Sequence, residues 1–172
     1  MNERLTSGSA RLDRILSGGL VTRATHLIIG LPGSGKTILA QQYLFRNSTR
    51  EHPGIYFSTV SESLEKMLRF GQTLSFFDRE ALGTRVFFED LGAPLHAGGL
   101  EEVLNQFARL LQKHRAGLVI IDSFKALRAY ADSEESFRRF LHGMTERTAG
   151  LAVTSLWVGE YRAEELERIP EA

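Results

Sequence analysis

The segment from Gly30 to Thr37, with the sequence GLPGSGKT, combines residue types and spacing that indicate a specific chemistry. It fits the pattern G-x-x-x-x-G-K-[ST] and follows an apolar stretch at 26–29. Glycines at positions 33 and 35 let the backbone turn its N–H groups inward around phosphate oxygens. A plain turn between a strand and a helix is the alternative. The Lys-Thr pair in register favours a loop that binds a nucleoside triphosphate.

Each polar residue of this loop has an expected role. Lys36 reaches the β and γ phosphates as a mobile positive charge, and we count it among the catalytic residues. The hydroxyl of Thr37 is an oxygen ligand for Mg²⁺, and the helix that opens there turns its positive dipole end toward the phosphates. The expected nucleotide-binding residues are Gly30, Pro32, Gly33, Ser34, Gly35, Lys36, Thr37 and Ile38.

A second motif is the apolar run 118–121, which is followed directly by Asp122. This is the Walker B pattern, in which a buried strand holds a carboxylate near a bound Mg²⁺. We therefore predict Thr37 and Asp122 as the metal-binding pair. The alternative is that Asp122 only caps the next helix, since apolar strands often end in such a residue.

Glu62 lies after the second predicted strand and is the candidate general base that orients the attacking water. The alternative is a T-x-x-E capping box, formed by Thr59 and Glu62, that starts the following helix. No N-K-x-D tetrad for guanine occurs in the sequence, so adenine is the favoured base.

The composition excludes several classes of protein. The 172 residues include 21 Lys and Arg against 21 Asp and Glu, so no overall positive charge favours nucleic acid as a partner. There are no cysteines, which rules out disulfides and thiolate metal sites. No apolar run is long enough to cross a bilayer. We expect a cytoplasmic protein with no membrane contact.

The apolar pattern predicts strands that alternate with helices, which is typical of an α/β fold with a parallel sheet. Asp132 and Glu135 form a predicted capping box at the start of the last helix. We expect a loop at 92–99, which is either a plain connector or a lid. The predicted strands are 25–29, 55–59, 86–89, 118–122 and 151–158.

Parallel sheets of this kind bind ligands beyond the carboxyl ends of their strands. Every predicted strand is followed by polar groups, so we expect one rim of the sheet to gather them. Besides the phosphate loop, these residues are Glu62, Glu89, Asp90, Asp122, Ser123 and Glu160.

Three further segments resemble the KaiC-like branch of the RecA superfamily of P-loop ATPases. The first is the stretch Thr6-Ser7-Gly8-Ser9-Ala10-Arg11-Leu12-Asp13 followed by Gly18-Gly19-Leu20, which is much rarer than a phosphate loop. The others are Ile121-Asp122-Ser123 and Thr154-Ser155-Leu156-Trp157-Val158-Gly159-Glu160-Tyr161. The resemblance covers nearly the whole chain.

The resemblance implies a RecA-like parallel sheet flanked by helices on both faces, in a three-layer αβα arrangement. It also implies ATP with Mg²⁺, and a homo-oligomeric ring or filament with nucleotide between subunits. The clock protein of this family has adjacent glutamates where this chain has Ser61-Glu62. Family domains continue beyond the Glu160 region, so we expect residues 1–172 to form one domain without the final strands. The last strand would then have an unpaired edge.

We therefore expect Mg²⁺-dependent ATP binding and hydrolysis by a regulatory or signalling ATPase, with ATP, ADP, copies of itself and an unidentified signalling protein as partners. Two alternatives stay open. One is an ATP-dependent serine/threonine autokinase, because the clock relative phosphorylates itself. The other is a nucleotide-sensing assembly module with little or no turnover.

Overall fold

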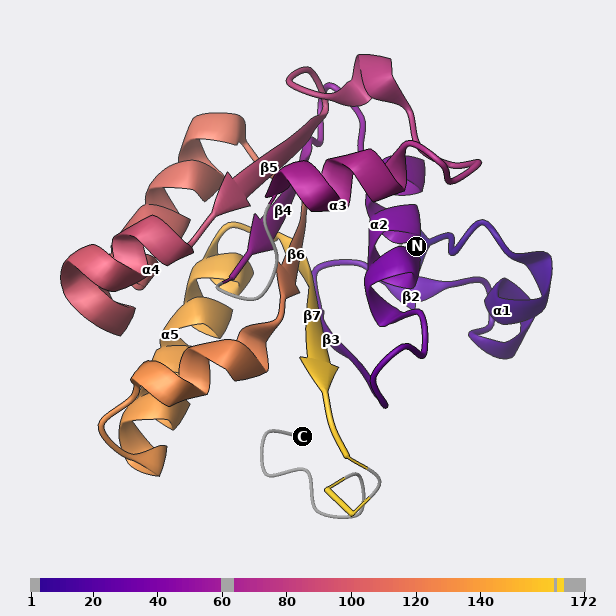
Figure 1. Ribbon diagram of the computed structural model, residues 1–172. Helices are drawn as coiled ribbons and strands as arrows, with labels where there is room; N and C mark the ends of the chain where they lie inside the picture. Colours follow the sequence, from indigo (N-terminus) through magenta and orange to yellow (C-terminus); the bar gives the residue numbers. More distant parts are fainter. Residues whose placement is uncertain (1–3, 60–63, 163, 166–172) are drawn as a thin grey trace.

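A computed structural model describes residues 4–59, 64–162 and 164–165, and these are the residues discussed below (Figure 1). In chain order, its elements are β1 Arg4–Leu5, α1 Ala10–Ile15, β2 Leu20–Val21, β3 Thr25–Gly30, α2 Lys36–Asn47, β4 Gly54–Ser58, α3 Leu64–Gly71, the 3₁₀ helix η1 Arg79–Ala81, β5 Val86–Asp90, α4 Gly92–His114, β6 Leu118–Asp122, the 3₁₀ helix η2 Phe124–Tyr130, α5 Glu134–Gly150 and β7 Thr154–Glu160.

The main sheet has five parallel strands in the order β3-β7-β6-β4-β5. All five predicted strands are present, although β7 starts at Thr154 and not at 151, because Leu151 caps the end of α5. The short antiparallel pair β1 and β2 was not predicted. The parallel α/β prediction is confirmed.

The last strand does not lie at an edge of the sheet, so that expectation was wrong. β7 is inserted between β3 and β6, and it pairs with β3 from Thr25 opposite Ser155 to Gly30 opposite Glu160. Within the described sheet the edge strands are β3 and β5. The phosphate-loop strand is therefore separated from the strand of Asp122 by one intervening strand.

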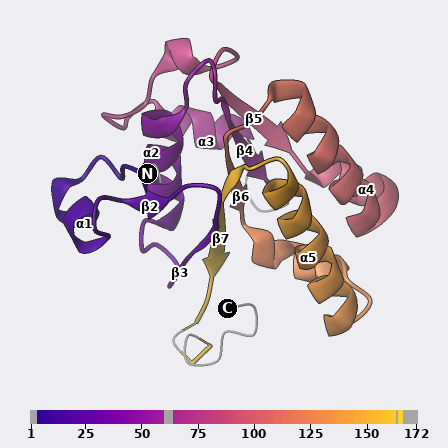
Figure 2. The same cartoon turned by 180° about the vertical axis from the view of Figure 1, so that it is seen from behind.

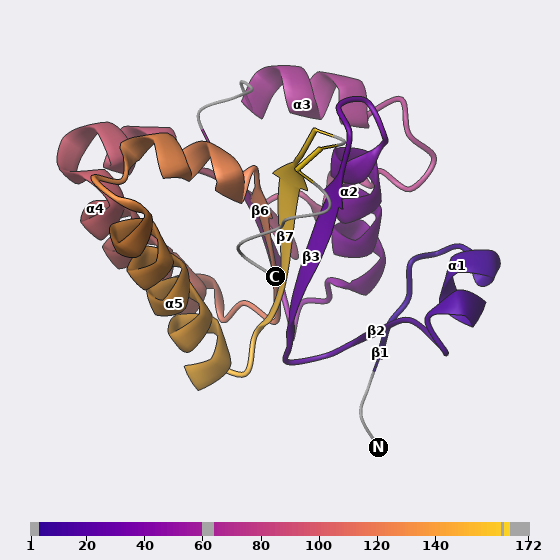
Figure 3. The same cartoon turned by 90° about the horizontal axis from the view of Figure 1, so that it is seen from below.

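Helices cover both faces of the sheet, which confirms three layers (Figures 2 and 3). Helices α2 and α3 lie on one face, and α4, α5 and η2 lie on the other. Alternate residues of β4 serve the two cores: Ile55 and Phe57 pack toward α4, while Tyr56 packs toward α2. All three side chains are fully buried.

The Gly- and Pro-rich segment at 92–99 is helical, which overturns the expected loop. It forms the first turns of α4, with a kink at Gly98 and Gly99, where φ is −154° and 64°. Pro94 is compatible with the first turn of a helix, because the N–H that proline lacks has no helical partner there. The kink separates this short piece from the longer part of α4, which carries the buried residues Val103, Phe107, Leu110 and Leu111.

The start of α5 also differs in detail from the prediction. Ser133, and not Asp132, is the N-cap residue, and its partner is Ser136 in place of Glu135. The Ser133 Oγ accepts from the Ser136 N–H at 3.1 Å, and the Ser136 Oγ accepts from the Ser133 N–H at 3.2 Å. The capping box is real but shifted by one residue.

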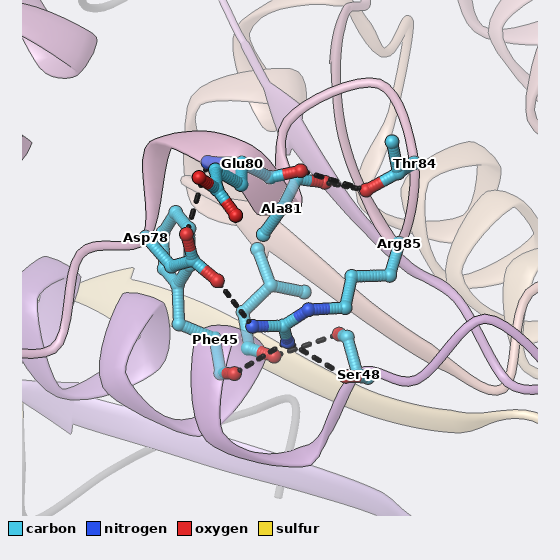
Figure 4. A network of polar contacts seen from close by, with 8 residues as sticks. Phe45, Ser48, Asp78, Glu80, Ala81, Thr84 and Arg85 are labelled. Atoms are coloured by element: carbon cyan, nitrogen blue, oxygen red, sulfur yellow. Dashed lines mark hydrogen bonds and ion pairs between the residues drawn. The ribbon is translucent and has the colours of Figure 1, made fainter.

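The carboxyl end of α2 is fixed by Arg85, which lies at the start of β5 (Figure 4). Its guanidinium donates to the backbone carbonyls of Phe45 at 3.0 Å and Ser48 at 2.8 Å. It also forms a 2.8 Å ion pair with Asp78, which lowers the pKa of that carboxyl. A positive group is favourable here because the last carbonyls of a helix lack helical partners.

The N-terminal segment is attached to the same end of α2. Asn47 accepts from the Thr6 N–H at 3.0 Å and donates to the Thr6 carbonyl at 2.9 Å, and Gln42 donates to the Ser7 carbonyl. Asp13 accepts from the hydroxyls of Ser7 at 2.6 Å and Thr6 at 2.5 Å, so these hydroxyls lower its pKa. The N-terminal segment that carries the family resemblance, from Thr6 to Asp13, is thus hydrogen-bonded to α2.

Candidate nucleotide-binding site

A cavity of about 560 Å³ lies at the carboxyl ends of the strands, between the phosphate loop, α2 and α3. This volume is within the range of small-molecule sites. Its lining residues are Gly33, Gly35, Lys36, Thr37, Ile38, Gln41, Ser58, Met67, Phe70, Asp122, Ser123, Val158 and Glu160. It brings together both sequence motifs.

The phosphate loop has the backbone that its glycines predict. Gly33 and Gly35 have φ values of 73° and 84°, in the left-handed region that favours glycine. No atom beyond their chain neighbours lies within 4 Å of the Cβ position at either residue, so the loop is open on that side. Gly35 is the N-cap of α2, and the helix begins at Lys36. The first N–H groups of α2 therefore have no helical partner and can bind an anion.

Lys36 extends back over the loop that precedes it. Its Nζ donates to the Leu31 carbonyl at 2.7 Å, and the Ser34 hydroxyl lies 3.5 Å away. The ammonium group is thus held at the mouth of the loop, where a phosphate would meet it. Gly30, Pro32 and Ser34 belong to the loop but do not line the cavity, whereas Ile38 does.

Thr37 and Asp122 meet although 85 residues separate them in the chain. The Thr37 hydroxyl donates to Asp122 Oδ2 at 2.6 Å. Thr37 lies at the start of α2, and Asp122 ends β6 two strands away from β3. The fold therefore places the two predicted metal-binding residues in direct contact.

Tyr56 is a site residue that sequence analysis did not identify. It lies on β4, is fully buried, and donates its hydroxyl to the same Oδ2 of Asp122 at 2.6 Å. In the sequence, Tyr56 looks like an ordinary buried residue of an apolar strand. The signal that could have identified it is its hydroxyl, which lies two positions before the end of β4, the strand that pairs with β6 and Asp122.

The ends of β4 and β6 are also joined by backbone and side-chain hydrogen bonds. The Thr59 N–H donates to the Asp122 carbonyl at 3.0 Å, and the Ser123 N–H donates to the Thr59 hydroxyl at 3.0 Å. The hydroxyl of Thr59 also donates to the Ser123 carbonyl at 3.1 Å. Thr59 is therefore hydrogen-bonded to the end of β6. The predicted capping box of Thr59 and Glu62 stays a prediction, because Glu62 lies outside the described residues.

The donor set at this point suits a small hard cation. Mg²⁺ prefers oxygen ligands and is commonly bound by one or two protein groups together with substrate phosphates. A hydroxyl and a carboxylate oxygen converge beside a loop of phosphate-binding geometry, so Thr37 and Asp122 fit this role. Among the described residues there is no cluster of three or more His, Asp or Glu that would hold a metal without phosphate.

The rim of the sheet gathers only part of the predicted polar set. Asp122, Ser123 and Glu160 line the cavity. Glu89 Oε1 instead lies 3.3 Å from Nε2 of His114 on α4. Asp90 Oδ1 accepts from the Gly92 N–H at 2.8 Å, at the start of the same helix. The residues that end β5 therefore serve α4 and not the cavity.

The wall opposite the phosphate loop is apolar and comes from α3. Met67 is buried in the core on the α2 face, and Phe70, one turn later, lines the cavity with 57% of its surface exposed. The end of α3 approaches α2 at Gln41, because a Cβ on Gly71 would lie 3.5 Å from Gln41 Oε1. The cavity thus has a polar end and an apolar end.

Comparison with known proteins agrees with this geometry. A family model described as "ATPase: KaiC" matches residues 5–170. This chain belongs to the KaiC ATPase family. The match covers both motifs and the N-terminal segment that closes onto α2. The family assignment supports nucleotide binding and ATPase chemistry at the level of the family.

Individual relatives are similar over nearly all of the chain. A UPF0273 protein of Methanopyrus kandleri is 29% identical, with 95% of this chain and 69% of the relative covered. A UPF0273 protein of Thermotoga maritima is 28% identical, with 96% and 73% covered. The circadian clock oscillator protein KaiC of a Picosynechococcus species is 32% identical, and the match covers 87% of this chain but 30% of that protein.

None of the helices in the described part of the chain has the length and apolar character needed to span a membrane.

Proposed function

We propose that this chain is a Mg²⁺-dependent ATPase domain of the KaiC family, which acts in a homo-oligomer as a regulatory or signalling ATPase. One observation carries the proposal. The 2.6 Å contact between Thr37 and Asp122 places a hydroxyl and a carboxylate beside an open phosphate loop and within one cavity. A turn of purely structural value would not require these two oxygens to converge at the loop.

The roles follow from position. The N–H groups from Gly33 to Thr37 bind the phosphates, and Lys36 reaches the β and γ phosphates. Thr37 and Asp122 hold the cation. When bound there, Mg²⁺ would supply positive charge that stabilises the charge developing on the phosphates. Glu62, on the segment between β4 and α3, positions water for attack on the γ phosphate.

The base of the nucleotide lies at the α3 end of the cavity. Phe70 offers an exposed aromatic face there, and Met67 and Ile38 add apolar surface. Aromatic rings stack on nucleobases without hydrogen-bond readout, so this wall contributes affinity more than base selectivity. The described lining of this end provides Gln41 as a polar side chain.

Calorimetric titration of the folded chain tests binding. MgATP and MgADP should each give a saturable signal, and MgATP in excess EDTA should bind more weakly. Absence of any saturable binding by either nucleotide, with the chain shown to be folded by circular dichroism, would disprove the proposed function.

Turnover is tested with Glu62→Gln. We expect this variant to bind ATP as the parent does and to lose phosphate release, because an amide cannot take a proton from water. Parent-level hydrolysis by the variant would show that Glu62 is not the general base.

ATP labelled at the γ phosphate distinguishes the alternative functions. Label released as phosphate indicates hydrolysis, and label retained on protein indicates the autokinase. Binding with neither product indicates the nucleotide-sensing module.

Assembly is tested by measuring molecular mass in solution with ATP, with ADP and without nucleotide. We expect a ring or filament whose population depends on the nucleotide, because ligand binding shifts an assembly only when its affinity differs between the two states. A mass that stays the same in all three conditions contradicts the assembly role.

A further inference from the structure

We infer that Tyr56 is a positioning residue for cation binding, and that it acts by fixing the carboxylate of Asp122 through a buried hydrogen bond. This inference rests on the proposed function. Its basis is the 2.6 Å hydrogen bond from the Tyr56 hydroxyl to Asp122 Oδ2, which complements the 2.6 Å bond from Thr37 to the same atom.

The sheet register explains how the two side chains meet. Tyr56 on β4 lies opposite Ile120 on β6, and Asp122 follows Ile120 by two residues, so all three side chains lie on the same face of the sheet. The tyrosine therefore reaches diagonally along the strand toward the rim. Its long ring places the hydroxyl at the carboxylate from inside the core.

The ring of Tyr56 is firmly held. Its exposed fraction is 0%, and it stacks on Phe88 of the neighbouring strand β5 with the ring centres 5.2 Å apart. A buried ring with such contacts has little freedom to rotate. The hydroxyl thus defines a fixed point against which the carboxylate is oriented.

The chemistry of the contact favours an orienting role. A hydrogen bond from a neutral hydroxyl to a carboxylate is stronger than one between neutral groups, so it restrains the carboxylate more effectively. Two donors, one from the core and one from α2, converge on Oδ2 and set the direction of the carboxylate plane. Groups that orient a metal ligand in this way typically change metal affinity by about 10- to 100-fold when removed.

Packing alone does not account for a tyrosine at this position. A phenylalanine would fill the same space and keep the contact with Phe88, without a polar atom in the core. The hydrogen bond to Asp122 offsets the cost of burying the hydroxyl and gives it a role that phenylalanine could not fill.

The test compares two conservative variants, Tyr56→Phe and Tyr43→Phe. Tyr43 is a buried tyrosine of the same core, with an exposed fraction of 1%, and its hydroxyl interacts with Ser7 and Asp13 of the N-terminal segment and not with Asp122. ATP affinity is measured by calorimetry over a series of free Mg²⁺ concentrations and again in excess EDTA. Denaturation curves confirm that both variants fold.

We expect Tyr56→Phe to require about tenfold more free Mg²⁺ for half of the magnesium-dependent gain in ATP affinity. ATP binding in EDTA should stay at the parent level, because the phosphate loop is untouched. Tyr43→Phe should match the parent in both measurements. In an Asp122→Asn background, Tyr56→Phe should add no further change to the magnesium dependence.

Three results would overturn the inference. The first is a Tyr56→Phe variant with the magnesium dependence of the parent, which would leave the proposed function intact. The second is an equal loss in EDTA and in magnesium, which would indicate damage to the cavity as a whole. The third is a parent chain that binds no nucleotide, which would refute the proposed function and the inference together.

Discussion

The two ends of α2 have opposite character. At its beginning, Lys36 and Thr37 face a cavity, and the preceding loop residues from Leu31 to Ser34 are exposed. At its other end, the last carbonyls accept from Arg85, and Asn47 is hydrogen-bonded to the N-terminal segment. One end presents unsatisfied donors to solvent, and the other has its acceptors satisfied by protein groups.

This difference suggests a division of labour along one helix. The closed end fixes the helix against β5 and the N-terminal segment, so the open end has a defined position over the sheet. Substitutions at the open end should change ligand binding with little effect on stability. Substitutions at the closed end should do the reverse. Measuring both properties for each variant tests this separation.

The largest effect is expected for Lys36→Ala. Loss of the ammonium removes charge-assisted hydrogen bonds to the phosphates, so ATP affinity should fall by about 100-fold or more. The denaturation midpoint should change little, because the side chain lies at the cavity mouth. Lys113→Ala, at an exposed position on α4, is the control and should bind ATP normally. A parent-like affinity for Lys36→Ala would contradict the role of this end.

The next effect is expected for Arg85→Ala, at the closed end. The variant loses two bonds to carbonyls and the ion pair with Asp78, so the free energy of unfolding should fall by about 2 kcal/mol. Urea denaturation measures this. Arg109→Ala is the control, because its ion pair with Glu102 is more exposed and should contribute less than about 1 kcal/mol. A strong loss of ATP affinity in folded Arg85→Ala, measured without denaturant, would contradict the separation of binding and stability between the two ends of α2.

A smaller effect is expected for Phe70→Ala, which extends the comparison to the apolar end of the cavity. ATP should bind about 5- to 10-fold more weakly, since one aromatic face for the base is lost. Magnesium tripolyphosphate, which has no base, should bind as it does to the parent. The control Tyr130→Ala removes another exposed aromatic residue, on η2, and should leave ATP affinity unchanged. Equal weakening of ATP and tripolyphosphate would place Phe70 in a structural role.

The smallest effect concerns acid stability at the closed end. The hydroxyls of Ser7 and Thr6 lower the pKa of Asp13 below its usual value of 3.8. The folded chain therefore binds this proton less readily than the unfolded chain, and stability is present above the unfolded pKa and lost as pH falls through the lower folded value. Asp13→Asn should have a lower midpoint at neutral pH and a shallower decline below about pH 4. Parallel curves for parent and variant would refute this role.

The two motifs that meet at the polar end of the cavity could be read from the sequence, because the phosphate loop and the acid after an apolar strand are local patterns. Thr37 and Asp122 were expected together, and the fold brings them into contact. The five strands followed from apolar runs for the same reason. Glu62 stays a prediction, since it lies outside the described residues.

The features that the sequence did not predict depend on long-range geometry. Tyr56 contacts Asp122 only because β4 and β6 are neighbours in a given register. The position of β7 inside the sheet depends on strand order, which apolar runs do not determine. The helical start of α4 was missed because Gly and Pro indicate a loop, although Pro94 falls in the first turn, where it is tolerated.

The insertion of β7 has a consequence for how the chain matures during synthesis. Within the described sheet, β3 pairs with β7. Thr25 lies opposite Ser155, which is 130 positions later in the chain, so β3 cannot pair until β7 has been synthesised. Pairing between residues so far apart in the chain carries a loop-closure cost that local contacts do not. The ribosome must therefore release β7 before β3 can form the ladder that runs from Thr25 to Gly30, and a nascent chain that stops short of β7 would leave the loop after β3 without this support.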